Sequence, residues 1–293
     1  MAQLIADKYR QWEAQCEARF RQLKANEEEL NRIFIEIYGL QGELDPEVKD
    51  QDITVRRAQL QREIKSLISY AIGCLFGRYS LDTEGVCYAG GAWDESKYRT
   101  VIPVRDNVLV LCDDEGAEED LAARIFGWVE TVYGKETLEE NLRFIADALG
   151  GQGTARQVIR HYLRTGFYED HVRTYRKRPI YWLVSSGKKN GFKALFYLHR
   201  YQPELLEKIL SEYVPARYHR CLSRMEALQG ITVSTAAEKL QHSKAIGKLT
   251  EQLAEIASFE EVLRPLAEQR IQLDLDDGVK VSYAKLQKVL QDI

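Results

Sequence analysis

Two aromatic-rich apolar runs, separated by a short polar turn, are the strongest constraint on the fold of this 293-residue chain. The runs are Ile180–Val184 and Phe192–Leu198, and the turn between them reads Ser-Ser-Gly-Lys-Lys-Asn-Gly. Residues of high β-propensity on either side of Gly and Asn-Gly signals are typical of a β-hairpin. The stretch from Arg176 to Arg200 therefore predicts a hairpin with a long, basic tip.

The predicted hairpin lies in the most basic part of a chain whose net charge is −4. From Arg164 to Arg200, nine Lys and Arg residues face two acids, Glu169 and Asp170, so the local charge is +7. Lys and Arg release the counterions that condense on a phosphate backbone, and a two-stranded ribbon fits a DNA major groove. Because the whole chain is mildly acidic, any nucleic-acid contact is expected from this local patch.

Seven residues of this patch are the candidate DNA contacts. The residues predicted to neutralise phosphates are Arg176, Lys177, Arg178, Lys188, Lys189 and Lys193. Asn190 is predicted to contact a base edge. The alternative on composition alone is a buried hairpin whose turn lysines are only solvated.

The N-terminal part of the chain favours helices. Residues 1–39 keep a helical apolar period. One side of that period carries Leu23, Leu30, Phe34, Ile37 and Tyr38. A second helix is expected over Val55–Phe76, and its end, apolar on most sides, is typical of a central core helix.

The C-terminal part predicts two long helices, over residues 204–228 and 232–264, as an antiparallel coiled-coil pair. The first of them is expected to bend at Pro215. In the second, Leu240, Ile246, Leu249, Leu253 and Ile256 follow roughly heptad spacing. Short strands are expected at Val101–Val104, Asn107–Cys112 and in a final strand-turn over Leu273–Val281.

These patterns predict a mainly α-helical fold, in which a helical spacer and coiled-coil arms accompany a small antiparallel β element. Three regions are expected: a helical spacer over 1–78, a mixed α/β recognition region with the basic hairpin over 79–202, and a helical hairpin or coiled-coil arm with the C-terminal tail over 203–293. The acidic block Asp113–Asp120 is expected to lead into a helix, whose dipole its charges complement.

No residue pattern in the chain predicts catalysis, cofactor binding or a metal site. There is no Pro-Pro pair, so the base-holding motif of amino-methyltransferases is absent. Gly150–Gly153 follows a helical segment rather than a strand, which favours a helix C-cap over a nucleotide loop. Glu63–Lys65 and Glu95–Lys97 each match half of a metal-nuclease pattern that occurs often by chance. Asp274–Gly278 lacks the downstream Glu of a calcium loop.

The cysteines and the N-terminus favour a cytoplasmic protein. The five cysteines form no CxxC pair, and their odd number favours free thiols in a reducing compartment. The N-terminus is polar and charged, so no signal peptide is expected. No window approaches the roughly 18 uncharged apolar residues of a membrane span, and we expect no membrane contact.

Four stretches resemble one family, the large adenine-specific DNA methyltransferases of BREX-type phage-defence systems, which are related to single-chain restriction-modification enzymes. The stretches are Asn26–Leu40, Ser69–Leu81, Tyr175–Arg200 and Asp274–Tyr283. They occur in family order over nearly the whole chain and resemble the C-terminal third of that family.

The resemblance implies a spacer with a DNA-recognition and clamping region, because the family carries its S-adenosylmethionine pocket and base-holding motif upstream. The implied partners are double-stranded DNA and an upstream methyltransferase domain, and S-adenosylmethionine is expected as a cofactor only of a full-length relative. Enzymatic activity of this chain stays undecided on sequence. The alternative function is a protein-interaction scaffold, whose arms and acidic block bind other proteins of the defence system.

Overall fold

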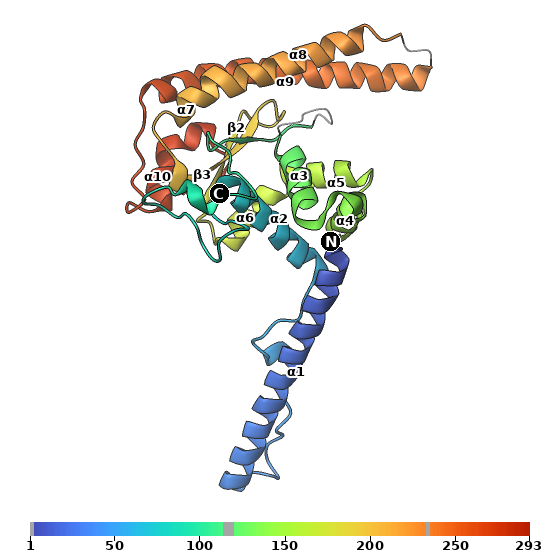
Figure 1. Cartoon of the computed structure of the whole chain (residues 1–293), viewed down its shortest axis with the longest axis vertical. Coiled ribbons are helices and arrows are strands. Elements are labelled where there is room, and N and C mark those ends of the chain that lie inside the picture. The colour runs from blue at the N-terminus through green and yellow to red at the C-terminus, as the bar shows by residue number, and fades with distance from the viewer. Residues whose placement is uncertain (1–2, 114–119, 233–234) are drawn as a thin grey trace. The chain divides into compact units, whose positions relative to one another are not determined.

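The computed structural model describes residues 3–113, 120–232 and 235–293, and these residues are mainly helical around a small antiparallel sheet (Figure 1). They form two compact units, one of residues 1–68 with 129–155 and the other of residues 69–128 with 156–293. The predicted fold class is confirmed. The predicted division into three regions, at 1–78, 79–202 and 203–293, stays a prediction.

The first unit is built on α1 (Ile5–Tyr38), the start of α2 (Leu60–Phe76) and α4 (Leu138–Leu149). The buried side chain of Asn141 accepts a hydrogen bond from the Ile5 backbone at 2.8 Å, which ties the start of α1 to α4. After Gly39, whose φ of 69° ends α1, the chain returns along the helix (Figure 1). The predicted first helix is thus confirmed as one helix.

In the second unit, the end of α2 is the central core helix that its apolar residues predict. Ile72, Cys74 and Phe76 are fully buried. This helix begins at Leu60 rather than at the predicted Val55. The other helices that precede the hairpin are α3 (Leu121–Tyr133), α5 (Ala155–Thr165) and α6 (Phe167–Thr174).

The sheet has the strand order β1-β3-β2 and is antiparallel throughout. Its strands are β1 (Leu109–Val110), β2 (Tyr181–Ser185) and β3 (Lys193–Tyr197), and Leu195 of β3 lies opposite both Leu109 and Leu183. The predicted hairpin is confirmed. The predicted strand at Val101–Val104 is wrong, because this segment is irregular and the Val104 N–H bonds the carbonyl of Leu75 instead of a strand.

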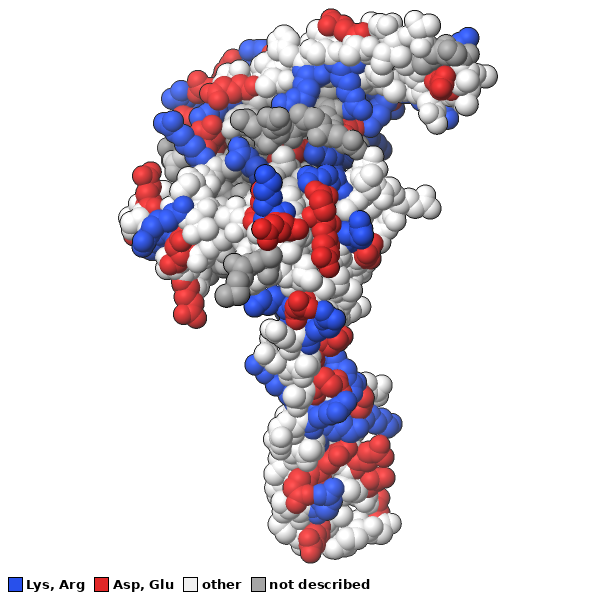
Figure 2. All heavy atoms as spheres, turned by 45° about the vertical axis from the view of Figure 1, so that its right-hand side comes forward, with Lys and Arg blue, Asp and Glu red and all other residues white. Residues whose placement is uncertain are grey.

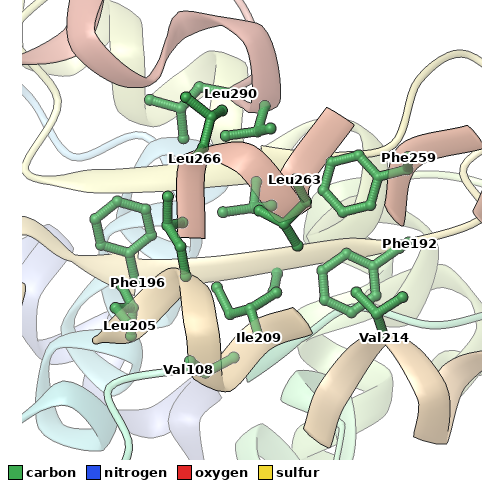
Figure 3. Close-up of a cluster of buried hydrophobic side chains, with 14 of the residues drawn as sticks. Val108, Phe192, Phe196, Leu205, Ile209, Val214, Phe259, Leu263, Leu266 and Leu290 are labelled. Carbon is green, nitrogen blue, oxygen red and sulfur yellow. The ribbon is translucent and has the colours of Figure 1, made fainter. Parts of the chain in front are cut away.

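The hairpin, α7 (Leu205–Lys208), α9 (Ala236–Glu268) and the C-terminal segment share one hydrophobic core. Phe192 stacks on Phe259 with ring centroids 5.8 Å apart, and both contribute to the cluster in Figure 3. Trp182 is fully buried there. Burial of this many apolar side chains fixes the hairpin against the helices.

The two long C-terminal helices pack antiparallel, as predicted. In α8 (Val214–Gln229), Met225 lies against Thr250 of α9, and Leu228 lies against His242 (Figure 1). A π-helical turn, Ile209–Tyr213, precedes Pro215, which has no N–H and would clash with the carbonyl of an ordinary preceding turn. Leu249 and Ile256 are buried, whereas Leu240, nearer the turn, is exposed.

The predicted strand-turn at Leu273–Val281 is wrong. Residues 271–274 are irregular, a turn follows, and α10 (Val279–Leu286) begins directly after Gly278. A later residue, Leu290, forms a single antiparallel bridge with Val184 at the open edge of β2. The short 3-10 turns are Asp50–Asp52, Glu95–Lys97, Lys135–Thr137, Leu198–Arg200 and Gln287–Val289.

Candidate nucleic-acid interface

The seven predicted DNA contacts separate into two groups. Arg176, Lys177 and Lys193 line one groove of about 490 Å³, together with Arg164 and Arg173 and two acids, Glu169 and Asp292. We call this the basic groove. Lys188, Lys189 and Asn190 lie instead at the tip of the hairpin, and Arg178 is exposed just after the groove residues.

The backbone of the basic groove is strained at two of its exposed cations. Arg176 and Lys177 have φ values of 50° and 61°, in the left-handed region that favours Gly or Asn. Their N–H groups bond the carbonyls of Arg173 and Val172, which closes the end of α6. Each such residue costs about 1–2 kcal/mol. Glycine would adopt these φ values without steric strain. The presence of two cations there instead indicates that their side chains have a function.

The charges around the basic groove are only partly compensated. Arg164 pairs with Asp113 at 2.9 Å and Arg173 with Asp170 at 2.8 Å. Among the described residues, Arg176 and Lys177 have no carboxylate within ion-pair distance. Burial and the nearby Arg164 lower the pKa of Lys193, although Glu255 and Glu169 oppose this shift. The groove thus combines unpaired positive charge with a half-buried lysine.

The hairpin tip is anchored to α9 through Glu255. The Glu255 carboxylate accepts hydrogen bonds from the N–H groups of Lys189 and Gly191 at 2.7 and 2.9 Å, and from the Ser186 hydroxyl at 2.7 Å. A Cβ on Gly191 would lie 2.7 Å from the Gln252 carbonyl, so this close approach requires glycine. No local pattern marks Glu255, and the sequence did not predict its role.

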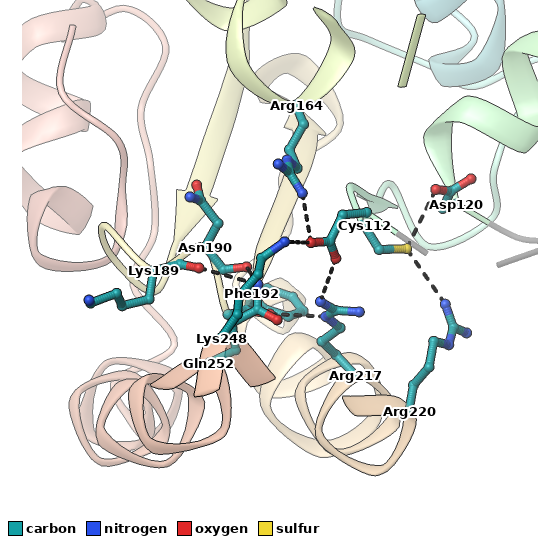
Figure 4. A network of polar contacts seen from close by, with 12 residues as sticks. Cys112, Asp120, Arg164, Lys189, Asn190, Phe192, Arg217, Arg220, Lys248 and Gln252 are labelled. Carbon is teal, nitrogen blue, oxygen red and sulfur yellow. Dashed lines mark hydrogen bonds and ion pairs between the residues drawn. The ribbon is translucent and has the colours of Figure 1, made fainter. Parts of the chain in front are cut away.

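The tip residues have partners of their own. Lys189 Nζ pairs with Glu251 at 2.9 Å, and the amide nitrogen of Asn190 donates to the Lys188 carbonyl at 3.2 Å. Gln252 of α9 donates to the carbonyls of Lys189 and Asn190, as Figure 4 shows. Several polar groups of the tip are therefore engaged in hydrogen bonds and ion pairs within the turn and with α9.

Asp113 joins three helices beside the basic groove. Its carboxylate pairs with Arg164 of α5 at 2.9 Å, with Arg217 of α8 at 3.2 Å and with Lys248 of α9 (Figure 4). Burial opposes ionisation, but the hydrogen bond from Lys248 and the positive charges of Lys248, Arg164 and Arg217 hold the pKa of Asp113 well below its usual range. Asp113 thus fixes the arm of α8 and α9 beside the hairpin.

The predicted acidic block lies largely at residues 114–119, which are outside the described residues. Its last member, Asp120, is buried and pairs with Arg160 of α5. Asp120 also accepts a hydrogen bond from the N–H of Ala123 at 2.8 Å in the first turn of α3, as a helix-capping carboxylate does.

Arg200, the last cation of the basic stretch, is structural. Its guanidinium donates to the carbonyls of Phe76 and Val104 at 3.1 and 2.9 Å and lies 4.3 Å from the ring centroid of Trp93. Trp93 stacks on Tyr98, with centroids 4.9 Å apart. Arg200, Trp93 and Tyr98 line a cavity of about 870 Å³, where Lys208 also pairs with Asp106, and we assign no ligand to it.

Within the described ranges, no group of three or more His, Cys, Asp and Glu side chains is arranged to hold a metal ion. The five cysteines are free thiols there, without disulfides. None of the described helices combines the length and apolar character needed to cross a bilayer.

Two curated proteins share extended similarity with this chain. An adenine-specific methyltransferase PglX of Lacticaseibacillus casei (strain Zhang) is 49% identical over 286 residues, which cover 95% of this chain and 24% of that protein. An adenine-specific methyltransferase BrxX of Escherichia coli O9:H4 (strain HS) is 40% identical over 248 residues, 78% of this chain and 20% of that protein. The chain thus spans about a quarter or less of the length of these relatives. No protein-family model matches it.

Proposed function

This chain is homologous to a region of the PglX and BrxX adenine-specific methyltransferases of BREX systems, and we propose that it is the DNA-binding and spacer region of such an enzyme. In this proposal the chain binds double-stranded DNA in the cytoplasm. Binding of S-adenosylmethionine and methyl transfer belong to a separate catalytic domain of the longer protein.

The basic groove carries this proposal. Cations from α5, α6, β3 and the turn after α6 converge on one concave surface, where they outnumber the acids Glu169 and Asp292, and two of them, Arg176 and Lys177, form no ion pair among the described residues. Phosphate contacts of this kind fix the register and orientation of a protein on a duplex without reading its sequence. Figure 2 shows that other surfaces of the chain, such as α1, intersperse Lys and Arg with Asp and Glu.

We assign the groove, rather than the hairpin tip, as the primary DNA contact. Bidentate recognition of adenine by Asn uses one N–H and the oxygen of the amide, and one of the two N–H groups of Asn190 already donates to the Lys188 carbonyl. At the tip, Lys189 already pairs with Glu251, and a base contact by Asn190 would use its second N–H and its amide oxygen.

The test is a duplex-binding titration of the chain and an Arg176→Asn/Lys177→Asn variant at several salt concentrations. Asn tolerates a positive φ, so these substitutions remove charge without new backbone strain. Loss of two phosphate contacts should lower the slope of log K against log salt by about 1.8 and weaken binding about tenfold or more at 0.1 M salt.

The matched control is Lys135→Gln/Arg143→Gln, which removes the same charge from exposed positions of the first unit. It should keep the salt slope of the unaltered chain. If both double variants weaken binding equally, the effect is one of net charge, and the groove is not the DNA site.

A further inference from the structure

The second half of α1 exposes a continuous apolar stripe. Its residues, with the exposed fraction of each, are Leu30 at 53%, Ile33 at 42%, Phe34 at 55%, Ile37 at 68% and Tyr38 at 70%. Their spacing of three and four residues places them on one side of the helix. Single exposed apolar residues are ordinary, but a contiguous row marks an interaction surface.

The returning chain after α1 covers a different face of the helix. Asn31 donates to the Pro46 carbonyl at 3.2 Å, Glu28 accepts from the Val48 N–H at 3.3 Å, and Lys24 pairs with Asp50 at 2.9 Å. These three contacts use residues offset from the stripe. The apolar stripe is therefore left uncovered by the first unit, to which all these residues belong.

The stripe has the register of a helix-pairing seam with acidic flanks. Leu30 and Ile37 take the a positions of a heptad and Ile33 the d position between them. The flanking e and g positions then include Glu27, Glu29 and Glu36, of which Glu29 pairs with Arg32 on the same helix. Figure 2 shows Asp and Glu, with Lys and Arg among them, beside uncharged surface at this end of α1. Charges at e and g decide which helix can pair with such a seam.

We propose that this stripe docks a partner helix whose apolar seam is flanked by Lys and Arg. The acidic flanks repel a second copy of this chain, which would bring its own Glu27, Glu29 and Glu36 to the same seam. They repel nucleic acid and anionic membranes for the same reason. The stripe spans about 13 Å, or two to three helical turns, which a short amphipathic segment can cover. This surface is independent of the basic groove and of the proposed DNA binding.

Two synthetic helical peptides test the proposal against the full chain. Both carry the same Leu seam, and one has Lys and the other Glu at the flanking positions. The Lys peptide should bind at least tenfold more tightly by calorimetry, and added salt should reduce this difference. An Ile33→Gln/Ile37→Gln variant should lose at least tenfold in affinity for the Lys peptide, and Glu29→Gln/Glu36→Gln should narrow the gap between the two peptides.

The seam substitutions lie at exposed positions and keep good helix formers, so far-ultraviolet circular dichroism should be unchanged. The matched control, Gln11→Ala/Gln15→Ala, alters exposed residues nearer the start of α1 and should bind the Lys peptide as the unaltered chain does. Equal affinity for the two peptides would overturn the proposal. So would a dimer, seen by sedimentation equilibrium, that the seam variant abolishes, because the occupant would then be a second copy.

Discussion

His171 holds the start of the hairpin through a neutral imidazole. Its Nε2 accepts hydrogen bonds from the N–H groups of Ile180 and Tyr181 at 3.2 and 3.0 Å, and its ring stacks on Tyr181 with centroids 4.7 Å apart. Burial, together with the positive charge of Arg78, lowers the pKa of His171 to about 3. A protonated ring would lose the acceptor, so these contacts require the neutral form.

This pKa predicts a loss of stability in mild acid. Below the ordinary histidine pKa of about 6.5, His171 binds a proton in the unfolded chain but not in the folded chain. The free energy of unfolding therefore decreases as the pH is lowered. Between pH 6.5 and pH 5, this effect of His171 should lower the free energy of unfolding by about 1.7 kcal/mol. Urea unfolding of the chain and of His171→Gln at both pH values measures this, and the variant should show the smaller drop.

The matched control for this experiment is His161→Gln, at an exposed position of α5. It removes an imidazole without touching the hairpin and should keep the pH dependence of the unaltered chain. An unchanged pH dependence in His171→Gln would mean that His171 does not carry the effect.

At the scale of elements, one carboxylate on α9 should govern the hairpin tip. In the unaltered chain the Glu255 carboxylate accepts hydrogen bonds from the N–H groups of Lys189 and Gly191. Glu255→Gln replaces one of the two acceptor oxygens with an NH2 donor and removes the charge. Hydrogen bonds to a charged group contribute about 1.5–3 kcal/mol. We expect a loss of about 2 kcal/mol in the free energy of unfolding and faster hydrogen exchange at Lys189 and Gly191.

Glu251→Gln, one turn earlier on α9, is the control for that variant. It removes only the exposed pair with the Lys189 side chain, which should contribute less than about 1 kcal/mol. Equal destabilisation by the two substitutions would show that Glu255 acts as an ordinary surface charge rather than as the anchor of the tip.

Elements with a strong local signal could be predicted from the sequence, and those that depend on a distant partner could not. The hairpin follows from apolar runs around a Gly and Asn-Gly turn, whereas near Pro215, where the sequence predicts a bend, the structure has a π-helical turn between α7 and α8. Val101–Val104 has the composition of a strand but no neighbouring strand to pair with, so its β-propensity is not realised. At Leu273–Val281 the predicted strand does not form, and α10 begins directly after Gly278.

At the scale of the whole molecule, the basic groove shows what a linear pattern omits. The cations Arg176, Lys177 and Lys193 could be identified from local charge alone. Their meeting with Arg164 depends on packing of α5 and α6 beside β3, which no local period encodes. The separation of the tip residues from the groove has the same cause, since Glu255 lies 66 residues from Lys189 in the chain.

The last prediction is that this chain alone neither binds S-adenosylmethionine nor methylates DNA. A nucleotide turn places glycine after a strand, whereas Gly150 here caps α4 through its N–H to the Ala146 carbonyl, and no strand precedes it among the described residues of its unit. The chain also lacks a Pro-Pro pair to hold an exocyclic amine. Calorimetry with S-adenosylmethionine and a plasmid methylation assay test both statements, with the full-length relative of Lacticaseibacillus casei as the positive control. A micromolar dissociation constant for the isolated chain would mean that it contains a cofactor pocket, and the division of labour proposed here would then be wrong.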